Sequence, residues 1–258
     1  MVLDTGTREA IADQLADAYR TATPIAPLRD EYELTLADAY AIQERVIDRR
    51  RDREGDIVGY KVGFTSDAVQ ERFDVDEPAY GALLEEMVHG GRIIDTSPLI
   101  DPQIEPEITF VLEAEPRSAR PHDVLAATRT IVPVIEIVDS RTKDWDVTAT
   151  EAVADGSLAA RLLTGPTRHD PDGIDLPLEG VQILKNGEQA AAGVGAAVLE
   201  HPSKAVSWLV ETLADHDTRL KAGDIVSTGS ITAPIPIESG DTVTCRFTNL
   251  GEVHARVR

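Results

Sequence analysis

Three glutamates lie in two segments that both predict β-strands. Glu105 and Glu107 belong to residues 102–110 (PQIEPEITF), and Glu136 lies in the middle of the aliphatic residues 134–139 (VIEIVD). Alternate side chains of an extended strand point to the same face, so Glu105 and Glu107 share a face. A buried carboxylate is very costly unless it is paired or binds a metal ion. If the three carboxylates converge, their all-oxygen ligand set predicts a site for Mg²⁺, Mn²⁺ or Ca²⁺.

A second interpretation of the same residues stays open at this point. Glu105 and Glu107 could form the solvated face of an edge strand, and Glu136 could form an ion pair with an arginine. Pro106 favours an edge strand or a bulge, because proline cannot donate a hydrogen bond to a neighbouring strand. Bulges often lie beside active sites. Spacing alone does not decide between a metal site and a solvated strand.

Lys61 is the one basic side chain in residues 57–64 (IVGYKVGF), a segment that predicts a strand with glycines at 59 and 63. Glycines inside a strand indicate the close approach of a ligand or of another backbone. A lysine among apolar residues and glycines could be an active-site group, or its side chain could simply extend to solvent. The sequence contains only five lysines, and they are Lys61, Lys143, Lys185, Lys204 and Lys221.

Composition limits the classes of function. The 258 residues carry 46 acidic and 25 basic side chains, with a net charge of −21. Such a charge argues against a nucleic-acid partner, because phosphate binding requires basic patches. An acidic surface with few lysines would suit a protein that works in concentrated salt, where screening weakens self-repulsion. Cys245 is the only cysteine, which excludes an intrachain disulfide and a thiolate metal cluster.

Neither a membrane partner nor export is expected. No apolar run approaches the length of a transmembrane helix. The first residues, 1–14, are acidic and amphipathic and lack the basic and apolar regions of a signal peptide. We therefore expect a cytoplasmic protein.

Two helices are predicted before the first strand. Residues 7–21 show helical spacing of apolar residues, with Thr7 as the expected cap. A second helix follows Thr35, where Asp38 stands in the position of a capping box. That helix ends in the arginine-rich residues 49–53, which we interpret as a solvated helix end, with a ligand-binding role as the alternative.

The rest of the chain is rich in strands. Ser66 is expected to cap a short helix that follows the first strand. The other predicted elements are a turn at 77–81, a short helix at 123–128, a hairpin at 181–191 around Asn186-Gly187, a helix from Pro202 to 216, and strands at 223–226, 230–237 and 242–247. Helices followed by strands predict an α+β protein with an antiparallel or mixed sheet. We divide it into an N-terminal helical segment, 1–56, and one compact β-rich, metal-dependent catalytic unit, 57–258.

Several common catalytic motifs are missing from the sequence. There is no GxGxxG after a strand and no Walker loop, so nucleotide binding is unsupported. There is no GxSxG motif, and the six histidines do not show HxH or HxxxH spacing. Carboxylates and one lysine are therefore the candidate chemical groups.

An ordered set of motifs resembles one family. The motifs are 59–66 (GYKVGFTS), 77–81 (EPAYG), the strand with Glu105 and Glu107, 136–141 (EIVDSR), 185–187 (KNG), 195–202 (GAAVLEHP), 223–224 (GD) and 228–230 (TGS). In this order they are similar to the 2-keto-4-pentenoate hydratase / 4-oxalocrotonate decarboxylase family, within the fumarylacetoacetate hydrolase superfamily. The resemblance runs from about Leu34 to the C-terminus.

The resemblance implies a fold and a site. It implies a mixed β-roll of the fumarylacetoacetate hydrolase C-terminal type, a Mg²⁺ or Mn²⁺ site formed by Glu105, Glu107 and Glu136, and an active-site lysine, Lys61. We expect the field of the three carboxylates to hold Lys61 charged in the metal-free protein. The residues that we further expect to bind substrate are Ser66, Arg141, Ser157 and Thr228.

The implied reaction is the hydration of a 2-hydroxypenta-2,4-dienoate-type acid (2-oxopent-4-enoate) to a 4-hydroxy-2-oxo acid in aromatic catabolism. Two departures from the family pattern favour alternatives: Ala79 replaces the aspartate common in hydratases, and Gly156 replaces an asparagine. Both are expected to remove a polar group near the substrate. Against them, residues 143–145 (KDW) resemble the hydratases.

The alternatives are 4-oxalocrotonate (2-oxo-3-hexenedioate) decarboxylation, then acylpyruvate hydrolysis, which needs a water-activating His/Glu pair, and then a non-catalytic partner subunit. The resemblance also implies a homo-oligomer, which could associate with a partner hydratase or decarboxylase.

Overall fold

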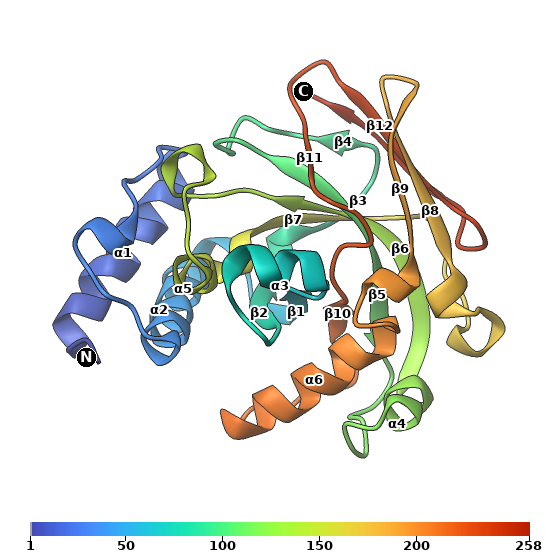
Figure 1. Ribbon diagram of the computed structural model, residues 1–258, viewed down its shortest axis with the longest axis horizontal. Helices are drawn as coiled ribbons and strands as arrows, with labels where there is room; N and C mark the ends of the chain where they lie inside the picture. Colours follow the sequence, from blue (N-terminus) through green and yellow to red (C-terminus); the bar gives the residue numbers. More distant parts are fainter. Residues whose placement is uncertain (1) are drawn as a thin grey trace.

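Residues 2–258 are described by the structure, a computed structural model, and they form two β-sheets with helices around them (Figure 1). The first sheet has eight strands, β1 (Ile57–Gly63), β2 (Ala79–Leu84), β3 (Val88–Gly90), β5 (Gln103–Leu112), β6 (Thr128–Val138), β7 (Ala159–Thr164), β10 (Ile225–Ser227) and β11 (Ile235–Pro236). The second has five, β4 (Ile93–Ile94), β8 (Gly180–Lys185), β9 (Glu188–Val194), β12 (Thr242–Phe247) and β13 (Glu252–Val257). The α-helices of the described residues are α1 (Thr5–Thr21), α2 (Leu36–Glu54), α3 (Asp67–Phe73), α4 (Pro121–Ala126), α5 (Ala149–Ala154) and α6 (Pro202–Asp215).

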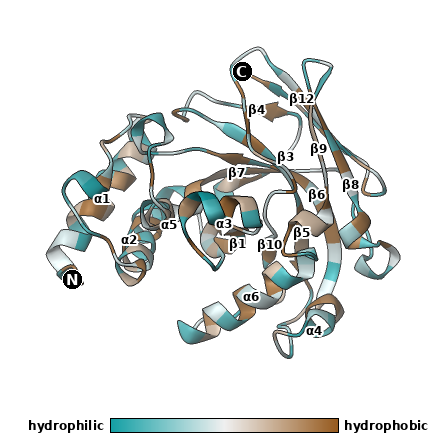
Figure 2. Ribbon diagram, in the orientation of Figure 1, coloured by the Kyte–Doolittle hydropathy of each residue, from teal (hydrophilic) through white to brown (hydrophobic). Residues whose placement is uncertain are grey.

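The pairing of the strands is mixed, as the α+β prediction requires. In the first sheet the order is β2-β1-β10-β5-β6-β7-β3, with β11 also paired to β5. The pairs β1–β10 and β3–β7 are parallel, whereas β5–β6 and β6–β7 are antiparallel. The long β5–β6 pair lies in the middle of this sheet, with apolar side chains such as Ile108, Phe110 and Ile135 fully buried. Figure 2 shows hydrophobic residues along these strands and on one side of the helices.

The N-terminal helices lie at one end of the molecule beside α5 (Figure 1). Helix α1 begins at Thr5, and its cap is Asp4, whose side chain accepts a hydrogen bond from the Thr7 backbone N–H at 3.0 Å. The prediction of Thr7 as cap is therefore wrong by one turn, since an aspartate three residues earlier takes that role. The capping box of Thr35 and Asp38 at the start of α2 is confirmed.

The interpretation of residues 49–53 as a solvated helix end is confirmed only in part: Arg51, Asp52 and Arg53 are exposed, whereas the two arginines before them are not. Arg50 is only 5% exposed and pairs with Glu54 at 2.7 Å. Arg49 pairs with Glu9 and Asp13 of α1. Arg50 therefore stabilises the last turn of α2, and Arg49 links α2 to α1.

Some of the predicted strands, turns and helices are confirmed by the structure, and others are wrong or differ in their bounds. Strand β1, the β8–β9 hairpin around Asn186-Gly187 and helix α6 are confirmed. The turn at 77–81 is wrong because Ala79 begins β2, which pairs with β1. The strand at 230–237 shrinks to Ile235–Pro236, and helix α4 begins at Pro121, two residues before the predicted start.

Strands β3, β4, β7 and β13 were not predicted. Each depends on partners distant in the chain, as β4 does on β13 and β3 on β7.

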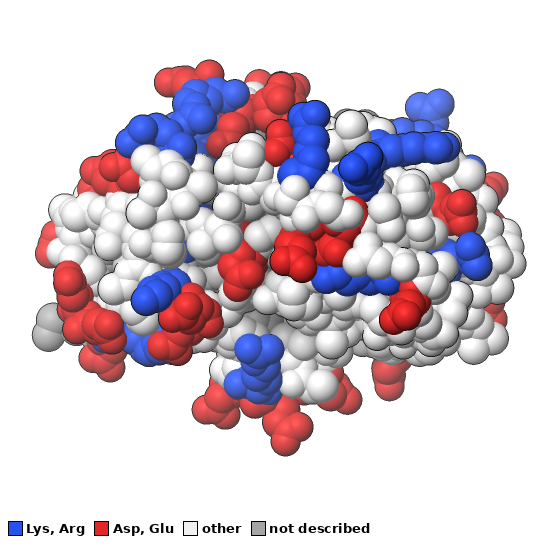
Figure 3. Space-filling model, turned by 90° about the horizontal axis from the view of Figure 1, so that it is seen from above, with Lys and Arg blue, Asp and Glu red and all other residues white. Residues whose placement is uncertain are grey.

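The proposed division at residue 56 falls between α2 and β1. Contacts cross it, because the Tyr19 hydroxyl donates to the Asp155 carbonyl at 3.1 Å and the Gln43 amide donates to the Tyr80 and Val153 carbonyls. The two-part division stays a prediction. None of the helices in residues 2–258 combines the length and the apolar composition that crossing a bilayer requires. On the face shown in Figure 3, basic side chains lie among acidic ones.

Candidate active site and metal centre

The three glutamates converge on one point of the first sheet. Glu105 of β5 is directly opposite Glu136 of the antiparallel strand β6, and Glu107 follows on the same face. One carboxylate oxygen from each lies within 4.8 Å of the others. Glu107 and Glu136 are fully buried. The alternative interpretation is therefore wrong: these residues are not a solvated edge, and Glu136 has no arginine partner among the described residues. We call Glu105, Glu107 and Glu136 the glutamate cluster.

Strand β5 is not an edge strand, although Pro106 favoured one. On the side of β5 away from β6, β10 pairs with Thr109–Val111 and β11 with Gln103–Ile104. Pro106 lies between these two pairings, where its carbonyl accepts a hydrogen bond from the Ile231 N–H. A residue without a backbone N–H is tolerated there because no strand pairs with that position on the side away from β6.

The hydrogen bonds of the glutamate cluster are incomplete. One oxygen of Glu107 accepts from the Ser227 hydroxyl at 2.5 Å and from the Gly229 N–H at 3.0 Å. The other Glu107 oxygen and both Glu136 oxygens are buried without a hydrogen-bond partner, although one Glu136 oxygen lies within ion-pair distance of Lys61. Buried polar atoms are normally satisfied, and an orphaned carboxylate oxygen carries a large desolvation cost. Three converging carboxylates with free oxygens fit a hard divalent cation in ligand type and charge.

Ser227 and Gly229 complete this cluster and were not predicted to act there. Gly229 has φ +106°, and a Cβ at this position would lie 2.1 Å from the Thr65 hydroxyl oxygen. Glycine is therefore required where the backbone N–H turns toward Glu107. The motif at 228–230 was the available signal, but it indicated Thr228.

Lys61 lies beside the glutamates in β1. Its ammonium nitrogen is 3.3 Å from a Glu136 oxygen and donates to the Ser157 carbonyl at 3.1 Å. The residue is 4% exposed, so it does not extend to solvent. Burial lowers the Lys61 pKa, but Glu136, Glu105 and Glu107 outweigh it and hold the pKa above its ordinary value. The ammonium group is therefore charged, as expected for the metal-free protein.

The pKa values of two of the carboxylates are raised as well, but here burial is the main cause. Burial raises the pKa of Glu105 to about 7, with Lys61 opposing the rise and Glu107 adding to it. Burial also raises the pKa of Glu136 well above its ordinary value. A cation that binds here must displace protons as well as water.

A cavity of about 150 Å³ opens beside the cluster. Its lining includes Lys61, Glu105 and Glu107, with apolar walls from side chains such as Phe64 and Trp145. Such an enclosure has room for a small organic acid and limits the access of bulk water.

The structure brings two of the four predicted substrate-binding residues to this cavity. Ser66 and Ser157 line it. The Ser66 side chain makes no capping hydrogen bond to α3, whereas the Ser157 hydroxyl donates to the Tyr80 carbonyl at 2.8 Å. Arg141 and Thr228 are not among the lining residues, so nothing in the cavity supports their predicted role in substrate binding, which stays a prediction.

Both are held elsewhere. The Arg141 guanidinium pairs with Asp155 at 2.8 Å, and the buried Thr228 hydroxyl donates to the Ile108 carbonyl. Ala79 and Gly156 do not line the cavity either.

Comparison with known proteins places this site in a family. A sequence model described as fumarylacetoacetate (FAA) hydrolase C-terminal matches residues 84–258. The 2-keto-4-pentenoate hydratase of Paraburkholderia xenovorans (strain LB400) is 37% identical over 250 residues, which cover 95% of this chain and 93% of that protein. The 4-oxalocrotonate decarboxylase of Pseudomonas sp. (strain CF600) is 37% identical over 251 residues, covering 96% and 95%.

Among solved structures, the 4-oxalocrotonate decarboxylase from Pseudomonas putida G7, complexed with magnesium and adipate, superimposes with a TM-score of 0.96 at 35% identity. The superposition covers 100% of this chain and 99% of the decarboxylase chain. The similarity therefore includes the N-terminal helices and does not begin at Leu34, as the sequence motifs suggested. The chain belongs to the 2-keto-4-pentenoate hydratase / 4-oxalocrotonate decarboxylase family of the fumarylacetoacetate hydrolase superfamily.

Proposed function

We propose that this protein is a divalent-metal-dependent hydro-lyase that hydrates a 2-hydroxypenta-2,4-dienoate-type acid (2-oxopent-4-enoate) to a 4-hydroxy-2-oxo acid in aromatic catabolism. The observation that carries the proposal is the glutamate cluster with its orphaned oxygens beside a buried, charged Lys61. The hydratases among the relatives support the same activity.

Glu105, Glu107 and Glu136 would hold Mg²⁺ or Mn²⁺. The magnesium in the related decarboxylase structure supports this choice of metal. When bound, the cation would supply Lewis-acid stabilisation of negative charge that develops on a substrate oxygen. Ser227 and Gly229 orient Glu107 for this role, because both donate to one oxygen and leave the other directed to the cluster.

Lys61 would carry the proton. Its Nζ is fixed by Glu136 and the Ser157 carbonyl, so the donor position is set before substrate enters. A proton must reach a substrate carbon when the dienol becomes the ketone, and water must then add across the remaining double bond. Ser66, at the cavity wall, is placed to bind a polar group of the substrate.

Decarboxylation of 4-oxalocrotonate is the second candidate, and Arg72 favours it. Arg72 lines the same cavity and has no ion-pair partner in residues 2–258. Its guanidinium group could bind the second carboxylate of a dicarboxylic acid. The related decarboxylase was solved with adipate, which is a dicarboxylate.

The remaining alternatives have less support. Hydrolysis of an acylpyruvate would need a water-activating His/Glu pair, and no histidine of the described chain lines the cavity. A non-catalytic partner subunit would not need the complete glutamate cluster with Lys61.

One experiment separates the two main candidates. The protein is incubated with 2-hydroxypenta-2,4-dienoate or with 4-oxalocrotonate, each with Mg²⁺ or Mn²⁺, and the products are analysed by mass spectrometry. Gain of water from the dienoate supports the hydratase, and loss of CO₂ from 4-oxalocrotonate supports the decarboxylase. Conversion of neither substrate contradicts both.

Three further expectations belong with this proposal. We propose that the two sheets form the mixed β-roll of the superfamily, that the protein acts in the cytoplasm, and that it forms a homo-oligomer, alone or with a partner hydratase or decarboxylase. Light scattering tests self-association and should be done in high salt, because the net charge of −21 makes copies repel one another in dilute buffer. A monomer in high salt would contradict it.

A further inference from the structure

A second cavity, of about 240 Å³, lies where the N-terminal helices α1 and α2 meet the first sheet, and it shares no lining residue with the cavity of the glutamates. We propose that it is a binding site for a small oxyanion, inorganic phosphate or a short carboxylate. The proposal does not depend on the metal site or on the reaction proposed above.

Arginine dominates the lining of this cavity. The arginines are Arg20, Arg50, Arg53, Arg141 and Arg161. Three carboxylates, those of Glu54, Glu86 and Asp139, also line it. In a chain with 25 basic residues against 46 acidic ones, five arginines around one cavity are a local reversal of the overall charge.

Part of this positive charge is neutralised by carboxylates. Arg20 pairs with Asp17 at 3.0 Å, and Arg50 pairs with Glu54 at 2.7 Å. The Nε of Arg141 donates to Asp155 at 2.8 Å.

Two guanidinium groups keep donors without an acceptor. Nη2 of Arg141 has no hydrogen-bond partner, although the residue is only 1% exposed. The half-buried Arg161 donates from Nη1 to the adjacent Ala160 carbonyl at 2.7 Å, and no carboxylate of the described residues lies within 4.0 Å of it. Burial lowers the pKa of Arg161, and the charges of Arg50 and Arg141 add to this effect, while Glu54 opposes it from beyond ion-pair distance. A buried donor without an acceptor is costly, so Nη2 of Arg141 lacks an acceptor in this cavity, and the neighbouring Arg161 lacks an ion-pair partner.

The lining carboxylates do not provide that acceptor. Asp139 accepts from the backbone N–H groups of Ile100 at 3.0 Å and Asp101 at 2.8 Å, and it lies 3.6 Å from Nη1 of Arg141. Glu86 is exposed at the surface and forms no ion pair with the described residues. An added anion would therefore meet donors that these side chains leave open.

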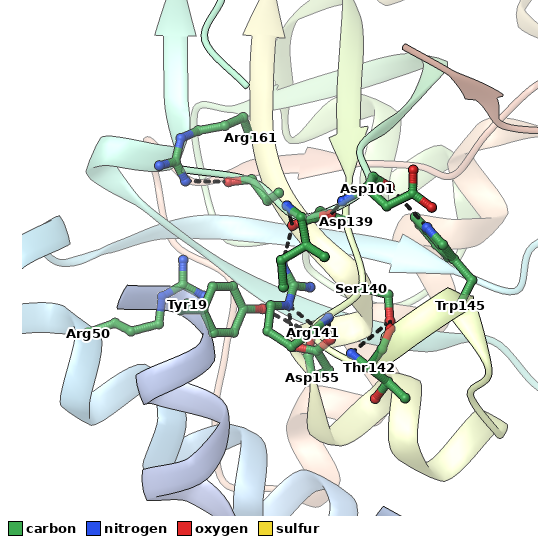
Figure 4. A network of polar contacts seen from close by, with 12 residues as sticks. Tyr19, Arg50, Asp101, Asp139, Ser140, Arg141, Thr142, Trp145, Asp155 and Arg161 are labelled. Carbon is green, nitrogen blue, oxygen red and sulfur yellow. Dashed lines mark hydrogen bonds and ion pairs between the residues drawn. The ribbon is translucent and has the colours of Figure 1, made fainter. Parts of the chain in front are cut away.

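The donors are held in place before any ligand binds. The guanidinium carbons of Arg50 and Arg141 lie 3.8 and 4.0 Å from the centre of the Tyr19 ring. Two groups cannot share one face of the ring at these distances, so they lie on opposite faces. Figure 4 shows Arg50, Tyr19 and Arg141 together, with Arg161 nearby. We call Arg50, Arg141 and Arg161 the arginine cluster.

Planar guanidinium groups bind two oxygens of one anion at once, which favours a carboxylate or phosphate over a spherical ion. The exposed Arg20 and Arg53 mark where the cavity reaches solvent. An anion could enter between them.

Isothermal titration calorimetry with inorganic phosphate tests the site in the full-length chain. Ionic strength is held constant with KCl, and each titration is repeated with Mg²⁺ and after chelation. We expect one saturable site in both conditions. A second series with acetate distinguishes phosphate from carboxylate as the preferred anion, and saturable binding of either supports the proposal.

Arg161→Met is the test variant, and Arg129→Met is its matched control. Arg129 lies on β6, is exposed, forms no ion pair with the described residues and does not line the cavity. We expect Arg161→Met to weaken phosphate binding about tenfold or more, because a charge-assisted hydrogen bond is lost, and Arg129→Met to leave it unchanged. Arg161→Lys keeps the charge without the planar fork and should bind with intermediate affinity; it carries the test if Arg161→Met does not fold.

Three results would overturn the proposal. The first is the absence of saturable binding of either anion, which would mean that water alone fills the cavity. The second is binding that requires Mg²⁺ and is insensitive to Arg161, which would place the anion at the glutamate cluster. The third is equal weakening by both variants, which would reflect net charge alone.

Discussion

In the glutamate cluster three carboxylates face one ammonium group, that of Lys61, whereas the two innermost guanidinium groups of the arginine cluster, Arg50 and Arg141, each have a carboxylate partner. Both clusters are buried in the same molecule. The first has an excess of negative charge and three oxygens without a hydrogen bond, one of which forms an ion pair with Lys61, and the second has one orphaned Nη2 beside an unpaired Arg161. The glutamate cluster therefore lacks positive charge, whereas the arginine cluster lacks an anionic acceptor.

The two clusters show how the effect of burial on a charged group depends on whether that group has a partner. Where partners are missing, burial raises the pKa of the carboxylates, so the metal-free glutamate cluster costs the folded state free energy. Where a partner is present, as for Arg141 with Asp155, the guanidinium group keeps its charge, although burial still raises the pKa of Asp155 against the opposing effect of Arg141. Arg141 also contacts helix α1 through the ring of Tyr19. We therefore interpret the first arrangement as built to bind an ion and most of the second as structural.

Changing Asp155 to Asn should have the largest effect on stability. The variant leaves Arg141 with Asp139, at 3.6 Å, as its only ion-pair partner within residues 2–258. Breaking a buried ion pair leaves an uncompensated charge, so we expect a loss of about 3 kcal/mol in the free energy of unfolding. Urea unfolding measures it. Stability equal to that of the parent protein would contradict the structural role.

The matched change in the other cluster is Glu136→Gln. It should remove most metal-dependent activity, a loss of about a hundredfold or more, because it removes a charged metal ligand. In the metal-free protein the free energy of unfolding should not fall, since burial already disfavours the ionised form of Glu136. Turnover with Mg²⁺ and urea unfolding after chelation check the two parts. A variant that keeps full activity would remove Glu136 from the metal site.

Lys61→Met should lower turnover by roughly 10²-fold, the usual scale for losing a general acid or base, while metal binding is largely kept. Steady-state kinetics and calorimetric metal titration give the two quantities. Lys61→Arg keeps the charge but not an easily transferred proton. Activity restored by arginine would make Lys61 an electrostatic group, and full turnover in both variants would make it structural.

The smallest effect is expected for the pH dependence of stability that comes from Asp38, a buried carboxylate whose oxygens accept hydrogen bonds. Burial opposes ionisation, but hydrogen bonds from Thr35 and Arg8 hold the Asp38 pKa at about 2, below its ordinary 3.8. A depressed pKa stabilises the fold above 3.8, and this contribution is lost as the pH falls through about 2. We expect the stability of the Asp38→Asn variant to fall less than that of the parent protein as the pH is lowered from 3.8 to about 2. Thermal unfolding at a series of pH values measures this. If both proteins lost stability equally at low pH, other carboxylates would be the cause of that loss.

Features that depend on neighbours in the sequence could be predicted without the structure. The capping box of Thr35 and Asp38 involves residues three apart, and the Asn186-Gly187 hairpin depends on one turn. The same holds for the shared face of Glu105 and Glu107, which follows from strand alternation. A charged residue within an apolar strand, as at Lys61 and Glu136, also indicated the site from sequence alone.

What the tertiary structure decided rests on pairs far apart in the chain. Ser227 donates to Glu107 across 120 positions, and Lys61 donates to Ser157 across 96, so no local pattern reveals either bond. Arg141 lies in a motif that resembles a substrate-binding segment, yet its guanidinium group contacts the buried Asp155 and the ring of Tyr19 and lines the second cavity, not the cavity of the glutamates. Sequence patterns determine which faces and termini carry charge, whereas the choice of partner for each buried charge is made by the packing of distant strands and helices, because only that packing sets which groups are desolvated together.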